Sequence, residues 1–230
     1  MPQSVLPSPL ITNLNKTPVF ILAGLMSFVA GYINSAMLME FALPVSQMTG
    51  IASLISDTIV TSQWGVLWDA CRILLGFLLG AILSGWMIGH RQYRQDKSYG
   101  YALLSISGLL GLAAVFAFIH SEVSVFLAAV ACGLQNAMVA SFKGLQIRTT
   151  HMTGIVTDIG VHLSLWLKHK TPWGWQSSLL MVLLISFVAG GATGILAYSS
   201  MPKIAMVFPS IIMALLGALY LIQMWRARAH

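Results

Sequence analysis

The stretch QMTGIASLIS (47–56) recurs as HMTGIVTDIG (151–160), and this recurrence organises the whole chain. Three further matches keep the same order: GYINSAM (31–37) with GLQNAMV (133–139), GFLLGAILSG (76–85) with SFVAGGATG (186–194), and LLGLAAVFAF (109–118) with LLGALYLIQM (215–224). In the first of these, the last two matching positions are slipped by one residue. Four matches in register indicate that the chain is an internal duplication.

The composition is that of a membrane protein. Of the 230 residues, 57% are hydrophobic and 8% are charged, whereas soluble domains carry about 25% charged residues. The sequence pI is about 9.6, but the chain has no basic run and no alternation of aromatic and basic residues. Nucleic acid is therefore not expected as a partner, and the lipid bilayer is.

Six stretches are long and apolar enough to cross a bilayer core, which takes roughly 20 helical residues. They predict an all-α polytopic protein made of two three-helix repeats. The first repeat, 19–119, has expected spans at 19–39, 66–89 and 99–119, and the second, 120–225, has them at 123–141, 176–198 and 204–225. A polar tail (1–18) precedes the repeats and a basic tail (226–230) follows them.

Charge predicts the topology. Three spans per repeat is an odd number, so the second repeat must be inverted relative to the first. With both termini cytoplasmic, ten of the twelve basic residues lie on the cytoplasmic side, as the positive-inside rule requires. If the two MTG segments also crossed, only about six basic residues would lie inside in the better orientation.

The MTG segments themselves, 48–62 and 152–167, are helical in period but too short and polar to span. Thr49, Ser53 and Asp57 share one helix face at i, i+4 and i+8, and Thr153 and Thr157 repeat the first two positions. Each segment is predicted to be a re-entrant or interfacial half-helix. Such backbone is tolerated at membrane depth where it is buried in protein or lines a wet cavity.

The MTG residues have two interpretations. Thr49 and Thr153 stand where an N-cap hydroxyl is expected, and Gly50 and Gly154 allow a tight turn. The positive end of each half-helix would then face a polar or anionic solute. Alternatively, the threonines only cap and the glycines only pack.

Further polar residues in apolar surroundings are candidates for the same site. Asn34 and Asn136 occupy matching repeat positions within spans, where an amide needs a hydrogen-bond partner. Gln135 and Gln47 are weaker candidates, and interhelical hydrogen bonding is the alternative role for the two asparagines.

Acidic residues and a histidine in the MTG segments suggest an ion or proton relay as a further hypothesis. Asp57 and Asp158 do not occupy equivalent positions, and Asp158 is four residues before His162. One aspartate and one histidine are too few ligands for a metal site. No metal or other cofactor is expected. Asp69 and Arg72, three residues apart, are predicted to neutralise each other.

Glycines at small-xxx-small spacing allow close helix packing, within the chain or in a homo-oligomer. Packing within the chain is the simpler expectation. The residues concerned are Gly76, Gly80, Gly85, Gly89, Gly190 and Gly194.

GLQNAMVASFKGLQIRTTHMTGIVTDIG (133–160) and GYINSAMLMEFALPVSQMTG (31–50) resemble the two signatures of the YoaK family of bacterial inner-membrane proteins. The resemblance extends from about 19 to 225 and implies a six-span inner-membrane protein without naming a substrate. The sequence departs from the family at two positions: Asn34 stands where an acidic residue is common, and Ile51 where an Asn often follows the first TG.

Two functions are compatible with this sequence. The first is a transporter or channel-like permease for an unknown small solute, and the second is a non-transporting membrane scaffold or assembly factor. An enzyme is not expected, because the sequence has no paired carboxylates, nucleophile–base motif or metal-ligand spacing.

Overall fold

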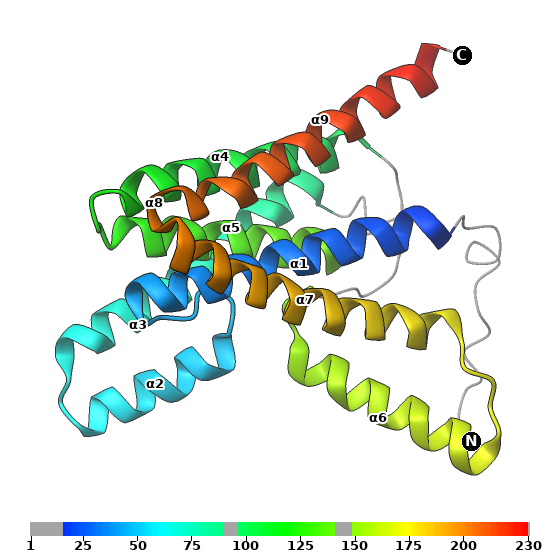
Figure 1. The fold of residues 1–230 in the computed structure, drawn as a ribbon, viewed down its shortest axis with the longest axis horizontal. Coiled ribbons are helices and arrows are strands. Elements are labelled where there is room, and N and C mark those ends of the chain that lie inside the picture. Colours follow the sequence, from blue (N-terminus) through cyan, green and yellow to red (C-terminus); the bar gives the residue numbers. More distant parts are fainter. Residues whose placement is uncertain (1–15, 90–95, 141–148, 230) are drawn as a thin grey trace.

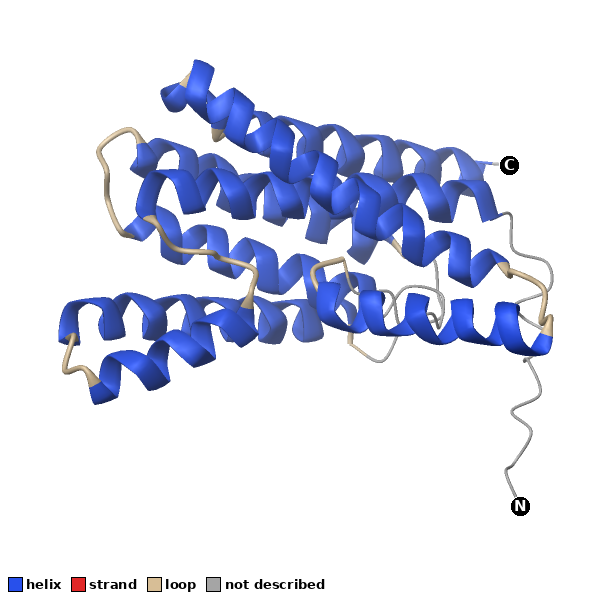
Figure 2. Cartoon of the chain, turned by 60° about the horizontal axis from the view of Figure 1, so that its bottom comes forward, coloured by secondary structure: helices blue, strands red, loops and turns tan. Residues whose placement is uncertain are grey.

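A computed structural model describes residues 16–89, 96–140 and 149–229, and all of its regular elements are helices. Figure 2 shows helices and short connecting loops, with no strand in these ranges. The helices are α1 (Lys16–Phe41), α2 (Met48–Val60), α3 (Trp64–Ile88), α4 (Lys97–Ala117), α5 (Val123–Ala140), α6 (Met152–His169), α7 (Trp175–Ser200), α8 (Pro202–Ala205) and α9 (Val207–Ala229).

Five of these helices are long and apolar enough to cross a membrane: α1, α3, α4, α7 and α9. The expected span 123–141 falls on α5, whose described apolar part, Val123–Met138, is shorter. The expected polar tail 1–18 lies almost entirely outside the described residues, while α9 extends to Ala229, into the tail expected at 226–230. The fold is all-helical, as the sequence predicts.

The long helices run side by side, whereas α2 and α6 are set apart along one side of the bundle (Figure 1). α2 and α6 begin next to each other near the middle of the molecule and run in opposite directions, toward opposite ends of the bundle (Figure 1).

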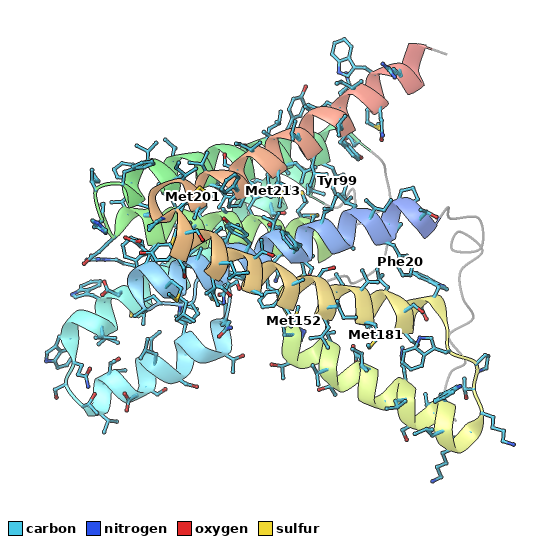
Figure 3. The ribbon with its side chains drawn as sticks, in the orientation of Figure 1. Phe20, Tyr99, Met152, Met181, Met201 and Met213 are labelled. Carbon is cyan, nitrogen blue, oxygen red and sulfur yellow. The ribbon has the colours of Figure 1, made fainter. Side chains whose placement is uncertain are left out.

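The first helix of each half, α1 in the first and α5 in the second, is the most buried part of the bundle. In the most apolar 18-residue stretch of each helix, 67% is buried in α1, against 22% in α3 and 17% in α9. In α5, every residue from 128 to 135 is buried. Side chains fill the space between neighbouring helices, including buried Met213 of α9 (Figure 3).

Helices from different halves of the chain pack against each other: α1 lies along α7, and α5 lies along α3. The closest approaches are glycines against backbone carbonyls, and they occur at matching repeat positions. A Cβ at Gly31 would collide with the carbonyl of Phe187, and a Cβ at Gly133 with the carbonyl of Phe77. The glycines let the two helix pairs approach until backbone meets backbone.

The reverse contacts match as well. A Cβ at Gly190 would collide with the Phe28 carbonyl, and one at Gly80 with the Val130 carbonyl. By contrast, an added Cβ at Gly85 meets nothing within 4 Å, and Gly89 ends α3 with φ of 57°. The glycine spacing thus serves contacts within the chain at Gly80 and Gly190.

Candidate functional site

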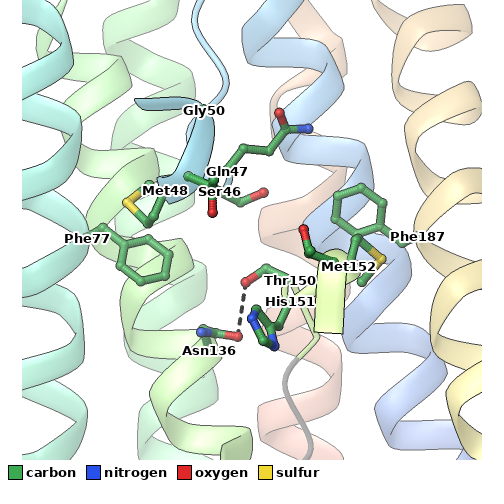
Figure 4. Close-up of a pocket in the computed structure, with 12 residues that line it drawn as sticks. Ser46, Gln47, Met48, Gly50, Phe77, Asn136, Thr150, His151, Met152 and Phe187 are labelled. Carbon is green, nitrogen blue, oxygen red and sulfur yellow. Dashed lines mark hydrogen bonds between the residues drawn. The ribbon is translucent and has the colours of Figure 1, made fainter. Parts of the chain in front are cut away.

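A cavity of about 480 Å³ lies where α2 and α6 begin (Figure 4). Both halves of the chain line it, largely through matching positions. Its lining residues are Ser46, Gln47, Met48, Thr49, Gly50 and Phe77 from the first half, and Asn136, Thr150, His151, Met152, Thr153 and Phe187 from the second. None of them is a lysine, arginine, aspartate or glutamate.

Two asparagines hold the segments that lead into the short helices. Buried Asn34 of α1 accepts hydrogen bonds on Oδ1 from the Ser46 backbone N–H (3.1 Å) and hydroxyl (2.9 Å). At the matching position, Asn136 of α5 accepts on Oδ1 from the Thr150 hydroxyl at 3.0 Å (Figure 4). Each amide therefore anchors its half-helix to the central helix of the same half.

The short helices present their N-terminal ends to the cavity. Their N-cap residues are Gln47 and His151, and neither makes a side-chain capping hydrogen bond. The expectation that Thr49 and Thr153 are the N-caps was wrong. The chain becomes helical at Met48 and Met152, so each threonine is already the second residue of its helix. A first helical turn leaves backbone N–H groups without intrahelical partners, and here those ends lie at the cavity.

Five of the sequence candidates line the cavity: Gln47, Thr49, Gly50, Asn136 and Thr153. Asn34 lies behind it and fixes Ser46. Gln135 is buried and donates through Nε2 to the Met26 carbonyl at 2.7 Å and toward the Thr149 hydroxyl at 3.4 Å. It joins α5 to α1 and lies outside the cavity lining.

Ser53, Thr157 and Gly154 do not line the cavity. The two hydroxyls are exposed and donate to carbonyls of their own helices, Ser53 to Thr49 and Thr157 to Thr153. Gly154 lies under the imidazole of His151, which a Cβ at this position would strike.

The relay candidates are not brought together. Asp57 and Asp158 are exposed and outside the cavity lining. His162 lies with Nδ1 2.7 Å from the hydroxyl of Ser177 on α7, and no ion pair of the described residues joins it to Asp158. The pair predicted between Asp69 and Arg72 is confirmed, at 3.1 Å.

Sequence reasoning missed Phe77, Phe187, Ser46 and Thr150 as cavity residues. Figure 4 shows Phe77 and Phe187 on opposite sides, with the starts of the short helices between them. The repeat alignment contained a signal for the two aromatics, because Phe77 and Phe187 are aligned with each other when GFLLGAILSG is matched with SFVAGGATG.

Five long apolar helices and the low charge content define a multi-pass membrane protein. Residues 22–219 match a family described as a protein of unknown function, DUF1275, and the chain belongs to that family. The match does not carry the YoaK name, so that likeness stays a resemblance of sequence. No curated protein and no solved structure matches the chain.

Proposed function

We propose that the chain is a small-solute transporter or channel-like permease of the bacterial inner membrane, with the cavity at the starts of α2 and α6 as its solute site. One observation carries this proposal: matching residues of the two halves, including the pairs Thr49/Thr153 and Phe77/Phe187, line a single cavity. Transporter sites typically lie near the midplane, between repeats and at the ends of broken helices.

The proposed architecture has six spans, α1, α3, α4, α5, α7 and α9, arranged as two inverted repeats with cytoplasmic termini. The opposite directions of α2 and α6 support it (Figure 1). So do the matching contacts of Gly31 with Phe187 and of Gly133 with Phe77. The distribution of basic residues along the sequence favours this orientation.

The cavity lining favours a small polar or anionic solute. Its polar groups are hydroxyls, an asparagine amide, a glutamine amide and an imidazole, beside the two helix N-terminal ends. The volume of about 480 Å³ falls within the roughly 300–1,000 Å³ of ordinary ligand sites. A cationic solute would find no carboxylate among these residues.

The test is uptake into proteoliposomes of a panel of small anions and neutral polyols, with the double variant T49V/T153V. The substitution removes both hydroxyls and keeps nearly the same shape. Loss of two hydrogen bonds of about 1 kcal/mol each predicts a roughly tenfold or greater fall in uptake at low solute concentration. Ser56→Ala is the matched control, because its exposed hydroxyl bonds only to its own helix at Ala52.

Uptake of a solute by the wild type that is unchanged in T49V/T153V would overturn the site assignment. A folded protein that passes no member of the panel and copurifies with one partner would instead favour the scaffold function.

A further inference from the structure

A carboxylate is enclosed in the last turn of α1, outside the lining of the cavity just described. The side chain of Glu40 is 7% exposed. The hydroxyl of Tyr198, on α7, donates to its Oε2, and Nδ1 of His120, in the α4–α5 turn, lies 2.5 Å from its Oε1. Three elements therefore converge on one acidic group.

Among the residues that the structure describes, no lysine or arginine is paired with this carboxylate. A buried carboxylate is costly unless it is paired with a positive charge. The Tyr198 hydroxyl is neutral, and His120 is charged only when protonated and is 79% exposed. Among the ion pairs of the described residues, none joins Glu40 to a lysine or arginine.

The surroundings of His120 do not supply the missing charge. His120 lines a small cavity together with Asp69, Arg72 and Glu122, and Glu40 is not part of its lining. Arg72 is engaged there by both Asp69 and Glu122. Among the described residues, Glu40, Asp69 and Glu122 therefore share the Arg72 guanidinium and the His120 imidazole.

Glu40 lines a different cavity, of about 400 Å³, which is separate from the cavity at Arg72 and whose other walls are largely apolar. Those walls come from the α4 end and the following turn, from α7 and from α8. The lining residues besides Glu40 are Ala117, Phe118, His120, Tyr198, Met201, Pro202 and Ile204. An acidic group with aromatic and aliphatic walls suits a cation that carries an apolar body.

We propose that this cavity binds a primary ammonium group attached to an apolar moiety, with Glu40 as its counter-ion and the Phe118 and Tyr198 rings beside it. A divalent metal is a poorer fit, because such ions take six or more oxygen ligands and the described residues hold no group of three or more metal-ligating side chains. The ammonium would take the place of His120, whose exposed side chain is free to swing away.

This chemistry has two sources, a free small amine and the headgroup of phosphatidylethanolamine. Glu40 stands in the last turn of α1, and in a spanning helix that position lies close to the lipid headgroups. Amine binding at Glu40 does not depend on solute transport through the central cavity, because the two cavities have different lining residues.

The experiment is calorimetric titration of the purified full chain, in an amine-free detergent and phosphate buffer, with phenethylamine and its neutral isostere 2-phenylethanol. Phenethylamine is expected to bind and 2-phenylethanol is not. Glu40→Gln, which keeps the shape and removes the charge, is expected to weaken phenethylamine binding at least about tenfold. Asp57→Asn, which removes an exposed carboxylate outside this cavity, is expected to leave binding unchanged. Equal binding of the two probes, or binding unaffected by Glu40→Gln, would overturn the proposal.

Should Glu40→Gln fail to give a monodisperse protein, Ile204→Trp tests the same point by filling the cavity, and unaltered binding in that variant would be a refutation. The lipid source is tested in nanodiscs. If phosphatidylethanolamine occupies the site, phenethylamine will bind more weakly in discs that contain it than in phosphatidylglycerol discs. Equal binding in the two kinds of disc identifies the free amine.

Discussion

Glycine decides how closely the two halves of this protein approach. At Gly31 and Gly133 the neighbouring atom is a backbone carbonyl of the opposite half, not a flexible side chain. A backbone carbonyl cannot rotate out of the way, so an added methyl group must push two helices apart. These carbonyls belong to Phe187 and Phe77, whose side chains also line the central cavity. The glycine–carbonyl contacts therefore set the positions of both rings.

Gly31→Ala and Gly133→Ala are expected to destabilise the protein by about 1–3 kcal/mol each, the cost of overpacking. Thermal unfolding in detergent measures this as a lower midpoint. Gly108→Ala, where an added Cβ meets nothing within 4 Å, is the control and should be neutral or slightly stabilising, because Ala favours helix over Gly. Equal midpoints for all three variants would show that the close approach is absent.

The two half-helices are held at their starts by side chains from the central helices. Asn34 accepts hydrogen bonds from both the backbone N–H and the hydroxyl of buried Ser46, whereas Asn136 accepts one from the hydroxyl of Thr150. The two anchors are thus equivalent in position but unequal in hydrogen bonding. Removing the Asn34 amide leaves a buried backbone N–H without its acceptor, which costs about 1–3 kcal/mol.

Asn34→Leu is therefore expected to loosen the start of α2 more than Asn136→Leu loosens the start of α6. Hydrogen–deuterium exchange of 42–50 and of 149–155 measures the two effects separately. Faster exchange confined to the first segment in Asn34→Leu is the expected result. Unchanged exchange in both variants would mean that other contacts hold the half-helices.

The sequence predicts the elements well and the contacts between them less well. Apolar runs and the short polar MTG segments suffice to predict an all-helical membrane protein, because both signals are local. The role of Ser46 depends on Asn34 of α1, a partner that no local pattern identifies. The repeat alignment pairs Phe77 with Phe187, but it does not show that their rings line one cavity. The N-cap expectation at Thr49 and Thr153 was wrong because the path of the preceding loop sets where a helix begins. Glu40 has no repeat partner to mark it, and only the packing of α1, α7 and the α4–α5 turn encloses it.

The proposed solute site at the starts of α2 and α6 requires the two halves of the chain to be inverted relative to each other in the membrane. Labelling of single cysteines tests this most directly, at Gln63 in the α2–α3 turn and Thr171 between α6 and α7, both exposed. Cys71 and Cys132 are first replaced by alanine, and a membrane-impermeant maleimide is applied to intact spheroplasts. Gln63→Cys should react from outside, and Thr171→Cys only after permeabilisation. Reaction of both cysteines from the same side would contradict the inverted architecture and the shared central cavity built on it.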